Sequence, residues 1–275
     1  MTVPSLALND GTRIPQLGLG TFKIDPADTF RVVGEAIELG YRHIDTAAYY
    51  RNEAGVGRAV RESGIPRGQF YVTTKLWNDD QGAQQAQDAF NRSLDELGLD
   101  TVDLYLIHWP CPAKDRYIES YRTLELIRAT GRASSIGVSN FMVEHLERLL
   151  AETEIKPVLN QIELHPIHQQ PEVVKYCHEH GIEIEAWGPL GQGKYPLLEL
   201  PEVTGPAAAH GKSPAQIVLR WHVQQRHIVF PKSTSTARLA ENLEVFDFGL
   251  SPAEMDAISA LERAGRMSGN PYEVN

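Results

Sequence analysis

Four side chains in the first half of the chain could together deliver a proton to a substrate. Tyr50 follows Asp45 by five residues, and Lys75 and His108 come later, each at the end of a short apolar or β-branched run. Reducing a carbonyl needs hydride at carbon and a proton at the developing alkoxide, and a phenol can supply that proton. We expect Lys75 to lower the pKa of Tyr50 by stabilising the phenolate, and Asp45 to keep Lys75 protonated. His108 would direct the carbonyl oxygen by hydrogen bonding.

Short apolar runs alternate with longer amphipathic segments along the chain, and these elements must position the four side chains. An N-terminal hairpin is predicted across the turn Asn9-Asp10-Gly11. Strands are predicted at 16–20, 43–45, 70–74, 102–107, 133–138, 158–163, 183–187 and 228–231. Helices are predicted at 28–39, 82–97, 117–129, 142–152, 171–180 and 214–225.

Eight strand–helix units without a Pro/Gly/Ser-rich linker predict one α/β domain over residues 1–275, a (β/α)₈ TIM barrel with the N-terminal β-hairpin closing its bottom. An open Rossmann sheet is disfavoured, because Gly18-Leu19-Gly20 and Gly55-Val56-Gly57 lack the third glycine of its dinucleotide motif. A nicotinamide cofactor would therefore bind a different surface.

Each of the four candidate side chains also has a purely structural explanation. Asp45 could cap a turn, Lys75 could be solvated, and His108 and Tyr50 could fill space in the core. In a barrel, however, groups that end successive strands gather at one rim. Their convergence at that rim favours a shared catalytic role over four separate structural roles.

The composition narrows the class of protein. A formal net charge of -10 argues against general binding to nucleic acid or anionic membranes. The two cysteines, Cys111 and Cys177, fit a reducing compartment. The N-terminus does not resemble a secretory signal, and no run approaches the ~20 apolar residues of a membrane span. We expect a soluble, cytoplasmic monomer that acts on a small molecule.

Two histidine spacings raise the question of a metal site. They are His165-Pro166-Ile167-His168 and His178-Glu179-His180. Neither is an H-E-x-x-H pattern, and no further partner lies at a diagnostic spacing. The sequence predicts no metal.

Over nearly its whole length the chain resembles the aldo-keto reductases. The matching segments are GYRHIDTAAYYRNE (40–53), TTKLW (73–77), DLYLIHWP (103–110), SIGVSNF (135–141), NQIELHP (160–166), FPKS (230–233) and AENLEVFDF (240–248). The resemblance implies that Asp45, Tyr50, Lys75 and His108 are the catalytic tetrad. It makes the adjacent Tyr49 a wall residue, because the family tyrosine comes five residues after the aspartate. Within the family, WGPLGQGKY and SPAQIVLRWH most resemble bacterial 2,5-diketo-D-gluconate reductases.

The resemblance also implies NADPH as the cofactor. Ser139, Asn140 and Gln161 match residues that hold the nicotinamide amide, and Trp187 matches the aromatic residue that stacks on its ring. The other cofactor contacts implied are Gly188, Leu190, Gly191 and Gln192 over the pyrophosphate, Lys232, Ser233, Thr234, Ser235 and Arg238 around the 2′-phosphate, Glu241 and Asn242 at the adenine, and in addition Thr21, Phe22 and Asp45.

The substrate cleft is expected above the nicotinamide. Its implied residues are Phe22, Tyr50, Trp77, His108 and Trp109. For Phe22 a core position is the competing interpretation. For the residues that follow the last strand, the competing interpretation is a solvated helix start capped by Thr236.

Two positions depart from the family pattern. Arg51 stands where relatives have a small residue, which would add positive charge near the cleft. Ser235 stands where a basic residue is expected, which would remove one phosphate donor and weaken the preference for NADPH. The polar tail, residues 263–275, is expected to fold over the rim and shape the pocket.

The function implied is reduction of aldehydes or ketones by NADPH, with dicarbonyls or keto-sugar derivatives as plausible substrates. Two other functions remain open at this point. One is an NADPH-binding sensor or regulatory protein on the same barrel. The other is a metal-dependent barrel isomerase or lyase.

Overall fold

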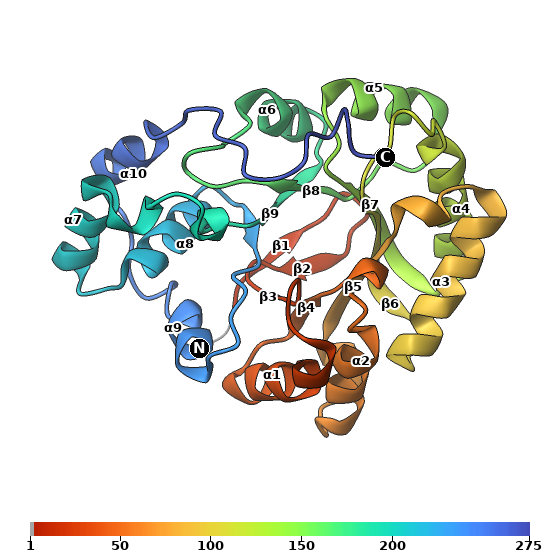
Figure 1. Ribbon diagram of the computed structural model, residues 1–275, viewed down its shortest axis with the longest axis horizontal. Helices are drawn as coiled ribbons and strands as arrows, with labels where there is room; N and C mark the ends of the chain where they lie inside the picture. Colours follow the sequence, from red (N-terminus) through yellow and green to blue (C-terminus); the bar gives the residue numbers. More distant parts are fainter. Residues whose placement is uncertain (1–2) are drawn as a thin grey trace.

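Eight parallel strands form the centre of the computed structural model, which describes residues 3–275 (Figure 1). They lie side by side in chain order. Leu17 pairs with Val229, and the Gly18 amide donates to the Val229 carbonyl over 3.0 Å, which closes the sheet into a barrel. The strands are β3 (Leu19–Gly20), β4 (His43–Asp45), β5 (Tyr71–Leu76), β6 (Val102–Ile107), β7 (Ala133–Ser139), β8 (Leu159–Glu163), β9 (Glu183–Trp187) and β10 (Ile228–Val229).

The predicted hairpin covers the amino-terminal end of the barrel. Its strands β1 (Ser5–Ala7) and β2 (Arg13–Pro15) are antiparallel. At its turn, the Asn9 side-chain amide donates to the carbonyls of Pro157 and Gly181, which precede β8 and β9. The predicted barrel with a closed bottom is confirmed.

Ten α-helices, counted over residues 3–275, surround the strands (Figure 1). The six predicted helices end within two residues of their expected bounds, whereas four others were not predicted. In α2, two glycines lower the helix propensity, and Gly57 is needed because a Cβ there would lie 1.8 Å from the Leu97 carbonyl oxygen. The helices are α1 (Pro26–Leu39), α2 (Glu53–Glu62), α3 (Ala83–Leu97), α4 (Tyr117–Ala129), α5 (Val143–Glu152), α6 (Pro171–Glu179), α7 (Pro201–His210), α8 (Pro214–Gln224), α9 (Thr236–Leu243) and α10 (Pro252–Ser259).

The interior of the barrel changes character along its axis. Near the hairpin it is filled by an apolar cluster that includes Ile14, Leu104, Leu159 and Ile228. Toward the carboxyl ends of the strands, the buried side chains become polar. The apolar cluster therefore closes the end of the barrel next to the hairpin, and the polar side chains that could take part in a reaction lie at the carboxyl ends of the strands.

The last residues of the chain cross this upper rim. In Figure 1 the segment after α10 runs over the carboxyl ends of the strands to the far side of the barrel. The predicted fold of residues 263–275 over the rim is confirmed. Among residues 3–275, no helix combines the length and apolar character that crossing a membrane requires.

Candidate active site

Asp45 and Lys75 form an ion pair inside the barrel. Asp45 ends β4, and Lys75 lies on β5, two residues beyond the partner of Asp45 in the strand register. The Lys75 ammonium donates to both Asp45 carboxylate oxygens over 2.7 Å and to the Thr46 carbonyl over 2.9 Å. Burial alone would lower the pKa of Lys75, but the Asp45 carboxylate, with help from Tyr50 and Glu185, raises it above its ordinary value. Lys75 is therefore a buried cation.

Tyr50 meets this pair from the short 3₁₀ helix that follows β4 (Ala48–Tyr50). Its hydroxyl lies 3.4 Å from the Lys75 ammonium, and its ring centroid lies 5.0 Å from that of Phe22. Burial raises the pKa of Tyr50 to about 12, and Lys75 only partly opposes this effect. The predicted lowering of this pKa is wrong, because loss of water outweighs one nearby cation. The phenol is thus protonated at neutral pH, as a proton donor must be.

His108 follows β6 and faces the same space. Its ring lies edge-on to Tyr50, with centroids 5.6 Å apart. Burial, and secondarily the charge of Lys75, lowers the pKa of His108 well below its ordinary value, so the imidazole is neutral. Within residues 3–275 its Nδ1 has no hydrogen-bond partner. A neutral imidazole can donate one hydrogen bond to a carbonyl oxygen.

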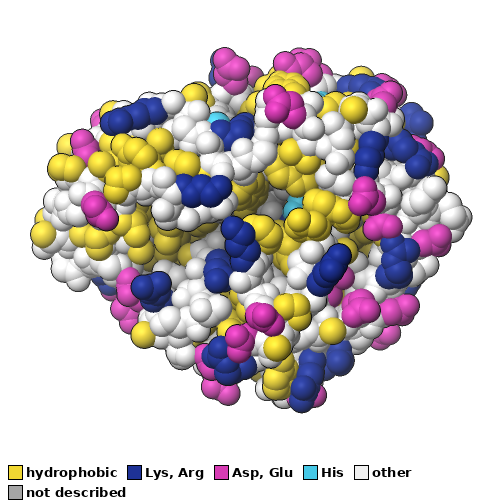
Figure 2. Space-filling model, in the orientation of Figure 1, with side chains coloured by type: hydrophobic (Ala, Val, Ile, Leu, Met, Phe, Trp, Pro, Cys, Tyr) yellow, Lys and Arg dark blue, Asp and Glu magenta, His cyan; other side chains and the backbone are white. Residues whose placement is uncertain are grey.

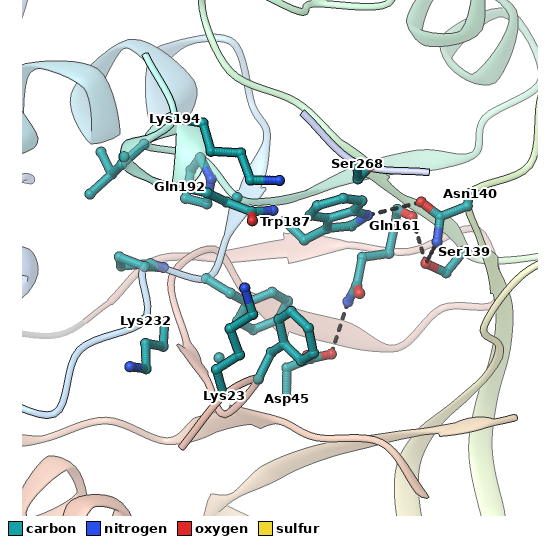
Figure 3. Close-up of a pocket in the computed structure, with 18 of the residues that line it drawn as sticks. Lys23, Asp45, Ser139, Asn140, Gln161, Trp187, Gln192, Lys194, Lys232 and Ser268 are labelled. Carbon is teal, nitrogen blue, oxygen red and sulfur yellow. Dashed lines mark hydrogen bonds between the residues drawn. The ribbon is translucent and has the colours of Figure 1, made fainter. Parts of the chain in front are cut away.

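A set of amide and hydroxyl groups lies beside Asp45 (Figure 3). In the strand register, Gln161 on β8 is opposite Ser139 on β7. The Gln161 side-chain amide donates to Asp45 over 2.8 Å. Asn140 donates to Ser139 over 3.1 Å and accepts from the Trp187 indole over 3.0 Å. These bonds orient the groups predicted to hold the nicotinamide amide.

Glu185 is a second buried carboxyl group that the sequence analysis missed. It lies opposite Gln161 in the register of β8 and β9 and accepts from the Gln161 amide over 2.6 Å. Burial, followed by the charge of Asp45, raises the pKa of Glu185 to about 8. Its place two residues before Trp187, on the same face of the strand, is the signal that could have found it.

A cleft of about 1090 Å³ opens over these groups. Figure 2 shows this face hollowed near its centre, with a histidine inside and Lys and Arg side chains around the hollow. The predicted residues that line it are Phe22, Asp45, Tyr50, Trp77, His108, Trp109, Ser139, Asn140, Gln161, Trp187, Gly188, Leu190, Gln192, Lys232 and Arg238. Lys23 and Lys194 line it as well and were not predicted, although Lys23 directly follows the aromatic Phe22 at the rim.

Tyr49 also lines the cleft, as expected for a wall residue. Its ring stacks on Trp77 with centroids 3.8 Å apart, and Trp77 lies edge-on to His108. This aromatic wall stands next to Tyr50 and His108.

Several predicted cofactor residues lie outside the lining of the cleft within residues 3–275. Thr21 is buried and its hydroxyl donates to the Asp45 carbonyl. The carboxylate of Glu241 accepts from the Ser213 hydroxyl. The others are Gly191, Ser233, Thr234, Ser235 and Asn242, all in the loops or helix that flank the lining residues.

The charge that Arg51 would add near the cleft stays a prediction, whereas the cap expected at Thr236 needs correction. Arg51 is exposed and lies outside the lining of the cleft within residues 3–275. Its backbone, at φ 56°, ends the 3₁₀ helix that carries Tyr50, and its side chain remains in solvent. Thr236 is the first residue of α9, and Ser235 occupies the N-cap position.

No group of three His, Cys, Asp or Glu side chains that could hold a metal ion occurs among residues 3–275. His165 and His168 lie near each other, with ring centroids 6.0 Å apart. The His165 ring instead contacts the Glu163 carboxylate at 3.2 Å.

The fold and the site together define a closed α/β barrel with a buried Asp–Lys pair, a tyrosine and a histidine at the floor of a large cleft. Comparison with known proteins gives the family. The profile of the Aldo/keto reductase family matches residues 16–263. This chain belongs to that family.

Individual relatives are similar over their whole length. An aldo-keto reductase of Mycobacterium sp. (strain JLS) is 50% identical over 275 residues, covering 100% of this chain and 99% of the relative. The glyoxal reductase of Bacillus subtilis (strain 168) is 46% identical over 271 residues, covering 98% and 97%. The crystal structure of a Gox0644 variant in complex with NADPH superposes with a TM-score of 0.95 at 43% identity, covering 100% of both chains.

Proposed function

We propose that this protein reduces aldehydes and ketones with NADPH, with Tyr50 as the proton donor and 1,2-dicarbonyl compounds as the substrate class. The observation that carries the proposal is the Tyr50 hydroxyl, 3.4 Å from a buried ammonium at the floor of the cleft. Two relatives support the details: one is named a glyoxal reductase, and a solved structure contains NADPH.

The residues of the cleft fit a dinucleotide phosphate. Lys232 and Arg238 lie at one end and can bind the 2′-phosphate, while Lys23 and Lys194 can bind the pyrophosphate. The Trp187 ring, fixed through its indole by Asn140, offers a flat surface for a nicotinamide. Both hydrogen bonds of the Gln161 nitrogen go to buried carboxyl groups, which leaves its oxygen to accept from an amide.

NADPH, when bound, supplies the hydride. The residues of the chain itself bind the carbonyl oxygen and give it a proton. Neutral His108 and protonated Tyr50 can both donate hydrogen bonds to that oxygen, which polarises the carbonyl. As negative charge develops there, Tyr50 gives up its proton, and the adjacent Lys75 ammonium stabilises the phenolate that remains.

The aromatic wall suits flat carbonyl compounds. Trp77, Tyr49 and Trp109 line the cleft together with Tyr50 and His108. A 1,2-dicarbonyl is planar and carries a second carbonyl oxygen that a hydrogen-bond donor could bind. These features favour glyoxal-like molecules as the substrates.

The test measures NADPH oxidation with a panel of aldehydes, ketones and dicarbonyls. Tyr50→Phe should lower kcat/KM by roughly 100-fold or more, the usual contribution of a positioned general acid. NADPH binding, followed by fluorescence, should remain. Tyr49→Phe is the matched control and should keep most of the activity. Tight NADPH binding without turnover of any carbonyl would instead support a sensor.

A further inference from the structure

The C-terminal tail, residues 263–275, forms one side of the cleft. Ser268, Gly269 and Val274 line it. A Cβ at Gly269 would lie 2.7 Å from the Val274 side chain and 3.9 Å from the Trp109 ring. The tail therefore packs closely, next to an aromatic residue of the proposed substrate site.

One buried carboxylate holds the part of the tail that enters the cleft. Glu163, at the end of β8, is 1% exposed. It accepts from the backbone amides of Met267, over 2.6 Å, and Ser268, over 3.2 Å, and also from the Ser268 hydroxyl. His165 completes the set, with its Nε2 3.2 Å away. Four donors thus converge on one carboxylate.

These bonds suit a charged acceptor. Burial alone would raise the pKa of Glu163, but the bonds from His165, Ser268 and Met267 lower it below its ordinary value. Hydrogen bonds to an ionised acceptor are stronger than those between neutral groups. A neutral side chain of the same size would hold the tail less firmly.

Other contacts fix the tail on either side of this point. The amides of Arg263 and Gly265 donate to the Ile167 carbonyl before it. Beyond it, the Tyr272 hydroxyl donates to Glu144 over 2.7 Å. Between these two ends, the Lys194 ammonium also donates to the Met267 carbonyl over 2.5 Å, so breaking the Glu163 bonds would loosen this middle segment without detaching the ends.

Glu163 also lies on the same face of β8 as Gln161, two residues away. Gln161 faces the Asp45–Lys75 pair, whereas Glu163 faces the tail. One strand thus sets the distance between the proposed reaction centre and the wall of the substrate site.

We propose that Glu163 is a specificity-determining positioning residue: by binding the Met267 and Ser268 amides, it holds the tail against the cleft and limits the size of carbonyl substrate that reaches Tyr50. The inference rests on the proposed function and adds the group that sets its substrate range. It predicts that weakening the bonds from the tail to Glu163 changes which substrates are accepted and does not change the rate of reduction of a small substrate.

The experiment compares the wild type with Glu163→Gln, whose amide replaces one acceptor oxygen by a donor. The substrates are methylglyoxal and the bulkier 1-phenyl-1,2-propanedione. In the variant we expect the KM for 1-phenyl-1,2-propanedione to fall at least fivefold relative to the KM for methylglyoxal. We expect kcat for methylglyoxal and the NADPH dissociation constant to stay within about twofold. Glu179→Gln, an exposed change on α6, is the matched control and should shift neither.

Hydrogen exchange reports on the anchor itself. The Met267 and Ser268 amides should exchange faster in Glu163→Gln, whereas the Gly265 amide should not change. Ser268→Pro removes an amide and a hydroxyl donor from the tail side without touching the barrel, so it should reproduce the shift even if the Gln variant folds poorly.

The outcomes separate the two proposals. Normal wild-type turnover with unchanged KM ratios in both variants would overturn the role of Glu163 alone. Unchanged exchange of the two amides in Glu163→Gln would overturn the anchor. A wild type that binds NADPH but reduces neither compound would contradict the proposed function, and this inference with it.

Discussion

Lys75 and Asp45 bind each other inside the barrel, with the ammonium donating to both carboxylate oxygens over 2.7 Å. The Lys75 side chain has no exposure to solvent, and that of Asp45 is 6% exposed. A pair this deeply buried supports the site only while both partners are present, because either charge alone would be poorly solvated.

Removing one partner should therefore be costly. Lys75→Met leaves the Asp45 carboxylate without its cation and should lower the free energy of unfolding by about 3–5 kcal/mol. The double variant Asp45→Asn, Lys75→Met should recover part of that loss. Urea denaturation measures both, and a single variant as stable as the wild type would contradict the buried ion pair.

Glu185 should make stability depend on pH. Its pKa is raised to about 8, so between its ordinary value and pH 8 the folded protein keeps a proton that the unfolded chain loses. Stability from this group is present at low pH and falls as pH rises through that window, with a limiting slope of about 1.4 kcal/mol per pH unit.

Glu185→Gln should remove this decline, because the variant cannot ionise and its side-chain oxygen can still accept from Gln161. Urea denaturation of wild type and variant at pH 5 and pH 9 tests the prediction. Equal losses of stability in the two proteins would show that another group titrates.

Cofactor choice should depend on the cations at the outer end of the cleft. Lys232→Ala removes a charged phosphate donor and should weaken NADPH binding roughly tenfold or more, while NADH binding stays unchanged. Lys175→Ala, an exposed change on α6, is the control. Fluorescence titration with both cofactors is the measurement, and equal losses for the two would contradict a 2′-phosphate site.

At Ser235 a substitution can add a cation to the proposed phosphate site instead of removing one. Within the described residues, 3–275, its exposed side chain makes no capping bond to α9, so Ser235→Arg would add a phosphate donor without removing a helix cap. We expect a tighter NADPH complex that loses its advantage in high salt. An NADPH affinity that does not rise would place Ser235 beyond reach of the phosphate.

A pair of helical glycines tests the packing of the barrel's outer layer. Gly57→Ala would place a Cβ 1.8 Å from the Leu97 carbonyl oxygen and should destabilise the protein by about 1–3 kcal/mol. Gly34→Ala in α1 meets no atom within 4 Å and should instead stabilise it by up to about 1 kcal/mol. Thermal unfolding distinguishes the opposite signs.

Much of the architecture was predictable because its signals are local. Alternating strand and helix patterns located all eight barrel strands, and the carboxyl ends of parallel strands brought Asp45, Lys75 and His108 to one rim. The same reasoning failed for α2 and α7, where glycine or proline lowers the helix propensity and packing against neighbouring elements overrides that preference.

The residue types and spacings alone determined the barrel, its hairpin and the four groups at the floor of the cleft. Only the tertiary structure decided how those groups are charged, since burial raises the pKa of Tyr50 although a cation lies beside it. It also brought Glu185 to Gln161, and the tail to Glu163 across more than a hundred residues. The physical reason is that hydrophobic periodicity depends only on the residues within each segment, whereas desolvation and long-range hydrogen bonds depend on everything that packs around a side chain.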